Sequence, residues 1–399
     1  MKIHNLRNIF CSIQKNGSTT RRRIQEETGL SWGTVSQFSN LLLSAGIAVE
    51  GSIQNGSIGK APTELELNPQ DYFLVGIDLT LSHTCGILIN LRGEEICSRS
   101  IAIEDPEHVI QDMCSMVQEF SSGSKQEKRI LAIGVSVAGS VDLQNGVLLH
   151  SIFSEKWENL EIRRMLETRL QLPVFVYHDS ECVLEAEKRM GIIAGSACKN
   201  IALVTLQYGV GMAFTHDSRH YYSSGMHQCE LGHITVYPGG TLCNCGKRGC
   251  LEMYASRLGI PRQFLEAVRQ GAVTDVNPYI FDASLYDTIR DHALRGDPLC
   301  LRLFEQLGKL LGSACASMCT LLEPDVLILY GGLLEDGTLW KEIFETYFRE
   351  NIFPMCQTKI RYSTLTAAAP MLGAAFCALD MCLDDFLAEV LYDNGHTRT

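Results

Sequence analysis

The stretch that decides the fold lies past the middle of the chain and reads Glu230-Leu-Gly-His233, followed shortly by Cys243-Asn-Cys245-Gly-Lys-Arg-Gly-Cys250-Leu-Glu252. The glycines between the cysteines permit tight turns that would bring three thiols and one imidazole to a single point. Three cysteines and one histidine form a closed tetrahedral ligand set suited to structural zinc. We therefore predict one structural Zn2+ per chain, held by His233, Cys243, Cys245 and Cys250. Chance clustering is the competing interpretation, because the chain has 16 cysteines in 399 residues.

The same stretch resembles the combined zinc and sugar motif of the ROK family, which groups bacterial repressors, open reading frames and sugar kinases. The family pattern is Glu-x-Gly-His followed by Cys-x-Cys-Gly-x-x-Gly-Cys-Leu-Glu, and each of its letters is present between residues 230 and 252. The resemblance can be followed over nearly the whole chain, and it points to the branch that contains xylose and N-acetylglucosamine repressors. It implies an actin-like, ribonuclease-H-type sugar-kinase fold of two lobes with a sugar cleft between them.

Composition and charge favour a cytoplasmic protein whose DNA contacts lie at the N-terminus. There is no run of about 18 apolar residues, so no membrane span is expected, and many cysteines in a chain of this size favour a reducing compartment. The whole chain carries 34 Lys+Arg against 46 Asp+Glu, whereas residues 1–50 hold six basic and three acidic residues. An acidic body repels nucleic acid, so any contact with DNA falls to the N-terminal segment.

The N-terminal segment has the pattern of a winged helix-turn-helix. Apolar residues at helical spacing predict a helix over residues 6–15, a second ends near Gly29, and Ser31 caps a third. The Gly/Ser-rich residues 51–59 predict a β-wing, and residues 59–62 resemble the linker of ROK repressors. Residues expected to reach phosphates or base edges are Arg21, Arg22, Arg23, Trp32, Thr34, Ser36, Gln37 and Asn40. An ordinary three-helix packing unit without a DNA role is the alternative.

The remainder alternates strands and helices, which predicts an α/β body. Strands are expected over residues 72–77, 85–89, 96–103, 130–137 and 174–177, with a helix over residues 106–120. We expect a DNA-binding domain with its linker over residues 1–70, a small lobe over 71–184 and a large lobe over 185–380 with the zinc motif and the oligomerisation surface. A C-terminal helix over 381–399 is expected to complete the small lobe.

The two loops that hold ATP phosphates in kinases of this family depart from the pattern. The first has Thr80 and Leu81 where two glycines belong, and the second has Tyr208 in place of a phosphate-binding Thr. Glycine lets backbone N–H groups approach a phosphate closely, and these side chains would obstruct that approach. Productive ATP binding is therefore not expected, and no residue is expected to be catalytic. If the chain were a kinase, Asp179 would be the general base.

The residues expected to bind sugar match the family pattern better than the phosphate loops do. The resemblance implies a carbohydrate effector contacted by His178, Asp179, Glu230, His233 and Glu252, because carboxylates accept hydrogen bonds from sugar hydroxyls with high discrimination. His178 departs from the family's Asn at its position, which leaves the identity of the sugar open, and it could instead be a buried structural histidine.

These observations favour a sugar-responsive repressor that binds operator DNA as a homodimer or homotetramer. An active sugar kinase with an attached DNA-binding domain is the second interpretation, and a regulator that answers to a partner protein is the third. Phosphorylation of a sugar would identify the second, and operator binding that shifts with a sugar would separate the first from the third.

Overall fold

The computed structural model describes residues 1–51, 63–122, 128–151, 154–221, 229–277 and 284–396. The chain forms two compact units, of which the first joins Met1–Arg189 with Ala368–Thr399 and the second comprises Met190–Ala367. The sequence places the lobe boundaries after residues 184 and 380, whereas the first unit extends to Arg189 and resumes at Ala368. The first unit also takes in the N-terminal domain, which the sequence treats as separate.

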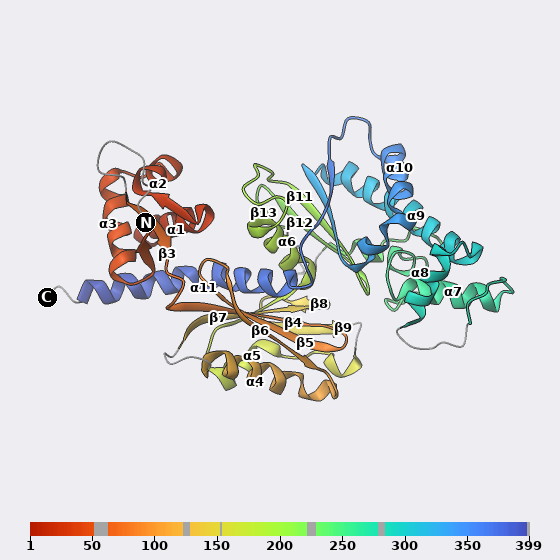
Figure 1. Cartoon of the computed structure of the whole chain (residues 1–399), viewed down its shortest axis with the longest axis horizontal. Coiled ribbons are helices and arrows are strands. Elements are labelled where there is room, and N and C mark those ends of the chain that lie inside the picture. The colour runs from red at the N-terminus through yellow and green to blue at the C-terminus, as the bar shows by residue number, and fades with distance from the viewer. Residues whose placement is uncertain (52–62, 123–127, 152–153, 222–228, 278–283, 397–399) are drawn as a thin grey trace. The chain divides into compact units, whose positions relative to one another are not determined.

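The first unit begins with a winged helix-turn-helix, here called the head (residues 1–67; Figure 1). Its elements are α1 (Lys2–Asn16), β1 (Ser18–Thr20), α2 (Arg21–Thr28), α3 (Trp32–Ser44), β2 (Ala48–Glu50) and β3 (Glu64–Leu67). The strands pair antiparallel in the order β1-β3-β2. Thr20 and Ser31 accept bonds from the backbone N–H groups of Arg23 and Thr34 and so cap the two helices of the motif. The predicted head is confirmed, but the expected wing tip and linker lie outside the described residues.

A five-stranded sheet in the order β10-β7-β4-β5-β6 forms the body of the first unit. Its strands are β4 (Tyr72–Leu79), β5 (His83–Asn90), β6 (Glu95–Ala102), β7 (Arg129–Val137) and β10 (Val174–His178). Strands β4, β7 and β10 are parallel, and β4, β5 and β6 form an antiparallel meander. One face packs against α4 (Val109–Ser122) and α5 (Ile162–Leu170) in an apolar cluster. The strands predicted from the sequence fall on these five.

The other face of this sheet is covered by α11 (Ala369–His396), which also contacts the head. The helix lies so close to the strands that a Cβ at Gly76 or Gly134 would collide with its backbone at Met371 or Ala374. The expected C-terminal helix over 381–399 is therefore found, but it begins at Ala369. A further helix, α6 (Asp179–Met190), follows β10 directly and packs against α11, since a Cβ at Gly373 would meet the backbone of Cys182.

The second unit is built on a five-stranded sheet in the order β13-β12-β11-β14-β15. Its strands are β11 (Ile201–Leu206), β12 (Val210–His216), β13 (Arg219–His220), β14 (Val326–Tyr330) and β15 (Lys359–Tyr362). The helices that share its apolar core are α7 (Gly259–Arg269), α8 (Ser284–Leu294), α9 (Pro298–Leu322) and α10 (Lys341–Asn351). Short 3-10 turns η3 (Leu231–His233) and η4 (Leu251–Met253) carry residues of the predicted zinc and sugar motif. Together the units confirm the α/β class.

Across the described ranges, the helices are either too short or too polar to cross a lipid bilayer.

Candidate metal centre, effector residues and DNA-contacting face

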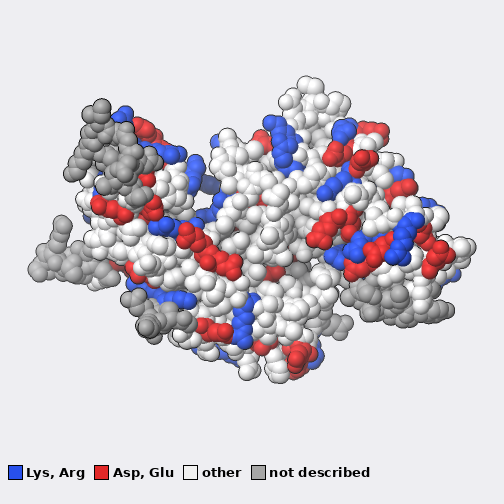
Figure 2. All heavy atoms as spheres, in the orientation of Figure 1, with Lys and Arg blue, Asp and Glu red and all other residues white. Residues whose placement is uncertain are grey.

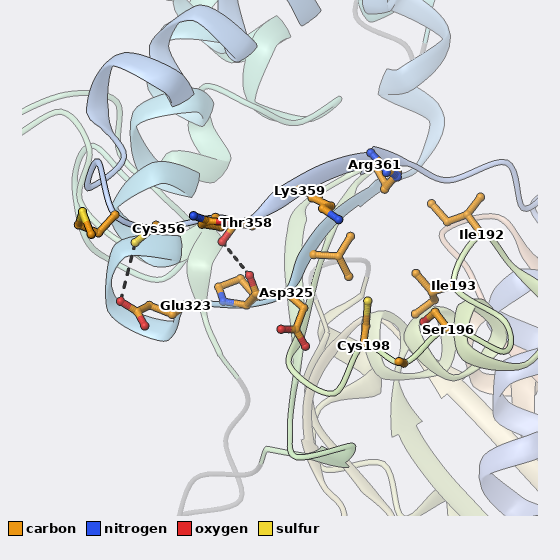
Figure 3. Close-up of a pocket in the computed structure, with 15 residues that line it drawn as sticks. Ile192, Ile193, Ser196, Cys198, Glu323, Asp325, Cys356, Thr358, Lys359 and Arg361 are labelled. Carbon is orange, nitrogen blue, oxygen red and sulfur yellow. Dashed lines mark hydrogen bonds between the residues drawn. The ribbon is translucent and has the colours of Figure 1, made fainter.

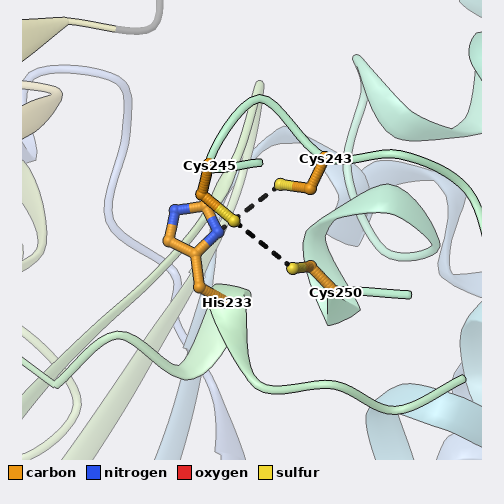
Figure 4. Close-up of side chains that lie close together, drawn as sticks. All are labelled: His233, Cys243, Cys245 and Cys250. Carbon is orange, nitrogen blue, oxygen red and sulfur yellow. Dashed lines mark hydrogen bonds between the residues drawn. The ribbon is translucent and has the colours of Figure 1, made fainter. Parts of the chain in front are cut away.

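Four side chains of the second unit converge on one point (Figure 4). The candidate ligand atoms of His233, Cys243, Cys245 and Cys250 all lie within 4.8 Å of one another. Tight turns bring them together, because Gly246 and Gly249 adopt φ values of 84° and 77°. A side chain at Gly249 would also collide with the backbone of Tyr237. The turns predicted from the glycine spacing therefore exist, and they gather the four predicted ligands.

The cluster fits a tetrahedral metal ion. Sγ of Cys245 lies 3.6 Å from Sγ of Cys250, and Sγ of Cys243 lies 3.6 Å from Nδ1 of His233. A zinc ion with Zn–S bonds of about 2.3 Å has ligand atoms about 3.8 Å apart, close to these separations. Burial and the adjacent Cys245 thiol raise the pKa of Cys250 to about 12, so a cation would be needed to hold neighbouring thiolates. The donor set and its spacing suit Zn2+.

Two predicted effector acids flank the cluster. Glu230 directly precedes η3, and Glu252 lies within η4, where it is 7% exposed. One carboxylate oxygen of Glu252 accepts a bond from the backbone N–H of Val210 at 3.2 Å. Burial raises the pKa of Glu252, the charge of His233 lowers it and that of Glu230 raises it. The structure therefore brings Glu230, His233 and Glu252 into one electrostatic neighbourhood within the second unit.

The other two predicted effector residues lie in the first unit. His178 ends β10 and Asp179 begins α6, and Nδ1 of His178 lies 3.0 Å from Oδ1 of Asp179. Nδ1 of His178 also lies 2.7 Å from Oγ of Ser180. Oδ1 of Asp179 is buried and accepts no hydrogen bond from the described residues, because the contact with His178 is an ion pair only when the imidazole is protonated. A buried acceptor without a partner is costly, so a sugar hydroxyl would improve its environment.

Asp78 is a neighbour of Asp179 that the sequence analysis did not include in the site. It lies near the end of β4, opposite Ser136 of the parallel strand β7, whose hydroxyl donates to it at 2.7 Å. Burial raises the pKa of Asp78 to about 7, against the effect of the Ser136 bond, and the charge of Asp179 adds to the rise. The sequence offered a signal, because Asp78 comes two residues before Thr80 of the first phosphate loop. Asp78 lies near Asp179 because the parallel strands β4 and β10 end at the same edge of the sheet. The order of the strands in the sheet cannot be read from the sequence.

The loops expected to have lost phosphate binding are closed by their own hydrogen bonds. In the turn after β4, the backbone N–H and the hydroxyl of Thr80 both donate to the carbonyl of His83 at 3.0 and 2.8 Å. At the start of β12, the N–H of Val210 donates to Glu252 and the N–H of Gly211 donates to Oγ1 of Thr205 at 3.1 Å. Backbone donors that are already bonded are poor phosphate ligands.

The side chains of the head that are predicted to contact DNA differ in exposure, and some of them are bonded to other side chains. Trp32 is 53% exposed, and Gln37 and Asn40 are also exposed, whereas Thr34 and Ser36 are half-buried. Arg21 donates to Oδ1 of Asn40 at 2.8 Å, so two of the residues predicted to contact DNA are bonded to each other.

The other two arginines form intrahelical ion pairs, Arg22 with Glu26 and Arg23 with Glu27, both at 3.1 Å. On the face of the molecule drawn in Figure 2, basic and acidic side chains are interspersed. Among the described residues visible on that face, Lys and Arg form no large patch free of Asp and Glu.

Two cavities of about 720 Å3 each lie in the second unit, and neither is lined by the predicted effector residues. One lies beside β14 and β15 (Figure 3), where Cys198, Asp325, Thr358, Lys359 and Arg361 contribute to its lining. The Asp325 carboxylate there accepts bonds from the backbone N–H groups of Lys199 and Asn200 at 2.8 and 2.9 Å. The acid is thus used to hold the start of β11.

Comparison with known proteins assigns both parts of the chain. The ROK family model matches residues 74–381, and a winged helix-turn-helix DNA-binding model matches residues 4–48. The xylose repressor of Bacillus spizizenii is 23% identical over 381 residues, which cover 94% of this chain and 95% of the repressor. The Escherichia coli regulator NagC is 25% identical over 332 residues, covering 82% of this chain and 80% of NagC.

One solved structure is similar to nearly the whole chain, and another is similar to only part of it. A ROK family transcriptional regulator described as a homologue of the E. coli MLC protein has a TM-score of 0.81 and 25% identity, covering 98% of this chain and 99% of its own. A ROK glucokinase from Streptomyces griseus, solved with glucose and AMPPNP, has a TM-score of 0.64 at 25% identity. It covers 77% of this chain and 99% of its own. The kinase therefore matches less of this chain than the regulator does, although each neighbour is covered almost completely.

Proposed function

The chain belongs to the ROK family and carries an N-terminal winged helix-turn-helix on an actin-like sugar-kinase fold, and from this premise we propose that it is a sugar-responsive transcriptional repressor. The observation that carries the proposal is the likeness to a ROK regulator over both parts of the chain, head included. The xylose repressor and the regulator NagC also match across most of their length. Operator DNA, a carbohydrate effector and a second copy of the chain are the proposed partners.

The closed phosphate loops support regulation over catalysis. Thr80 and Tyr208 stand where the family's kinases have phosphate-binding residues, and the donors of Thr80, Val210 and Gly211 are bonded within the protein. The acids proposed to bind sugar are retained: Asp179 on α6, and Glu230 and Glu252 beside the cysteine cluster. We propose that these acids accept hydrogen bonds from the effector's hydroxyls, with His178 and His233 beside them.

The proposed Zn2+ has a structural role. Held by His233, Cys243, Cys245 and Cys250, it would supply a fixed tetrahedral centre and no open position for chemistry. His233 belongs to both the metal set and the effector set, and Glu252 follows Cys250 by two positions. The metal would therefore fix the loops that carry Glu230 and Glu252, because metal ligands and the residues beside them orient one another.

The test is operator binding titrated with sugars. A duplex selected by the full-length protein from a random library would be the probe, and D-xylose, N-acetylglucosamine and D-glucose would be the sugars. We expect at least one sugar to change operator affinity by roughly 5- to 150-fold, the usual range for coupled sites. Glu252→Gln should reduce that response, because an amide replaces a charged acceptor.

A coupled assay of ADP release with the same sugars is the control. Turnover that Asp179→Asn abolishes would establish the kinase interpretation. Operator binding that no sugar alters would remove the proposed effector and favour control by a partner protein.

A further inference from the structure

The head is joined to the first lobe by a packed interface as well as by the chain that connects them. Residues of α1 share one apolar cluster with residues of α11, and both sets are buried. The contributors from α1 are Leu6, Ile9, Phe10 and Ile13, and those from α11 include Phe376, Leu379, Leu383, Phe386 and Leu387. Arg7 of α1 also pairs with Asp384 at 2.9 Å and donates to the carbonyl of Asp380 at 3.3 Å.

One guanidinium links this interface to a third helix. Arg189, in the last turn of α6, donates from Nε to Glu185 at 2.6 Å and from one terminal nitrogen to Asp380 of α11 at 2.6 Å. Its other terminal nitrogen donates to Oε1 of Gln14, in α1, at 2.7 Å. The guanidinium also lies over the ring of Phe376, 5.0 Å from its centre. The planar fork of arginine fixes several donors at once, so this side chain connects α6, α11 and α1 rigidly.

The opposite end of α6 carries a proposed effector residue. Asp179 is the first residue of this helix of 12 residues, which at 1.5 Å per residue is about 18 Å long. Its middle is buried against the lobe, with Cys182 and Val183 fully inaccessible. A helix held in this way would move as one body, and a shift at Asp179 would then be carried to Arg189.

We propose that Arg189 is a positioning residue that fixes the orientation of the head relative to α6 through Gln14, and that effector binding at Asp179 acts on DNA affinity through this contact. The second part rests on the proposed function, and the first does not. The chain offers a matched control in Lys188, which bonds the same Glu185 at 2.7 Å. Among the described residues, Lys188 makes no hydrogen bond to the head.

Gln14 allows the contact to be broken from the head side. Its amide nitrogen also donates to the carbonyl of Leu91 at 3.2 Å, so Gln14→Leu removes two bonds. Gln14→Glu keeps an acceptor for Arg189, now a charged one, and removes the donor to Leu91. The set of full-length variants is therefore Gln14→Leu, Arg189→Met, Gln14→Glu and Lys188→Met, compared with wild type. Gln14→Leu keeps the test sound if Arg189→Met folds poorly.

The first measurement needs no sugar. Hydrogen exchange of residues 2–16 should quicken roughly tenfold in Gln14→Leu and Arg189→Met, since each loses a charge-assisted bond. Affinity for the selected duplex should fall in the same two variants. Lys188→Met should match wild type, and Gln14→Glu should lose neither protection nor affinity, because its carboxylate still accepts from Arg189. Equal exchange and equal affinity in Gln14→Leu and wild type would overturn the positioning role.

The second measurement is the ratio of operator affinities without and with saturating D-xylose, N-acetylglucosamine or D-glucose. Where a sugar changes the operator affinity of wild type, we expect the ratio of affinities in Gln14→Leu and Arg189→Met to lie closer to one. Direct affinity for the sugar should be kept in both variants. An unchanged ratio in Gln14→Leu would overturn the transmission role. If wild type responds to no sugar, the proposed function fails, and the exchange data alone decide whether Arg189 positions the head.

Discussion

Individual side chains of the cysteine cluster make the metal prediction testable. Cys245→Ser should lose the metal, because a serine hydroxyl is a poor zinc ligand, and should destabilise the second unit by about 4 kcal/mol, near the upper end of single-substitution effects. Such a loss corresponds to a fall in melting temperature of roughly 10 °C. Metal content by mass spectrometry and thermal melting are the measurements. Cys356→Ser, which lies outside the cluster, is the control. Protein that is free of metal and melts like wild type would contradict the assignment.

Asp78 predicts a dependence of stability on pH. Its pKa is raised from the ordinary value of 3.8 to about 7, so between these values the folded state binds more protons than the unfolded state. Stability therefore falls as pH rises through that window, by up to about 1.4 kcal/mol per pH unit. Asp78→Asn cannot ionise and can still accept the Ser136 bond, so its stability advantage over wild type should grow by about 2 kcal/mol between pH 5 and pH 7.

Urea denaturation at several pH values measures this advantage. Ser136→Ala serves as the companion variant, because it removes a bond that favours the charged form and should shift the dependence to higher pH. Curves for wild type and Asp78→Asn that remain parallel across the window would show that Asp78 is charged in the folded protein.

Single positions also show how far sequence reasoning reaches. The cluster of His233 and three cysteines was predictable, because ligand type and glycine turns are both local. The bond between Arg21 and Asn40 was not, because it joins α2 to α3 and depends on how two helices cross. The same holds for Arg189, whose partners Gln14 and Asp380 lie far away along the chain.

Among the elements, α3 carries the prediction for DNA recognition. Gln37 is exposed on this helix, and an amide suits base edges, so Gln37→Ala should weaken the preferred duplex by about 1–3 kcal/mol and unrelated duplexes little. Arg22→Ala should weaken both about equally and reduce the salt dependence, because it removes a phosphate contact. Equilibrium titrations at several salt concentrations distinguish the two effects. A uniform loss in Gln37→Ala would assign that residue to the backbone instead.

Helices of the head were predictable to within a few residues because Thr20, Gly29 and Ser31 supply local start and stop signals. The start of α11 was not, since Gly373 and several alanines gave its first turns no amphipathic pattern. Those small residues reflect tertiary packing, because α11 lies against the backbone of β4, β7 and α6. A helix enclosed on more than one side loses the periodicity by which sequence reasoning finds it.

For the molecule as a whole, the shared core predicts that the head and the first lobe unfold together. Phe386 of α11 is 5% exposed, packs in the cluster that includes α1, and lies 5.0 Å from the ring of Tyr72, whose hydroxyl donates to Ala45 of the head. Phe386→Ala should cost about 3–5 kcal/mol, as buried aromatic truncations do. The loss should quicken hydrogen exchange in both α1 and β4, because both draw on the same cluster.

Phe264→Ala provides the matched control, because Phe264 is equally a core phenylalanine but lies in the second unit. It should quicken exchange in α7 and β12 and leave α1 protected. A head that keeps its protection in Phe386→Ala while α11 loses its own would mean that the two fold independently. In that case the head would be an independently folded DNA-binding domain that is joined to the lobe only by the connecting chain. Sugar control of DNA binding would then have to act through the linker rather than through α1.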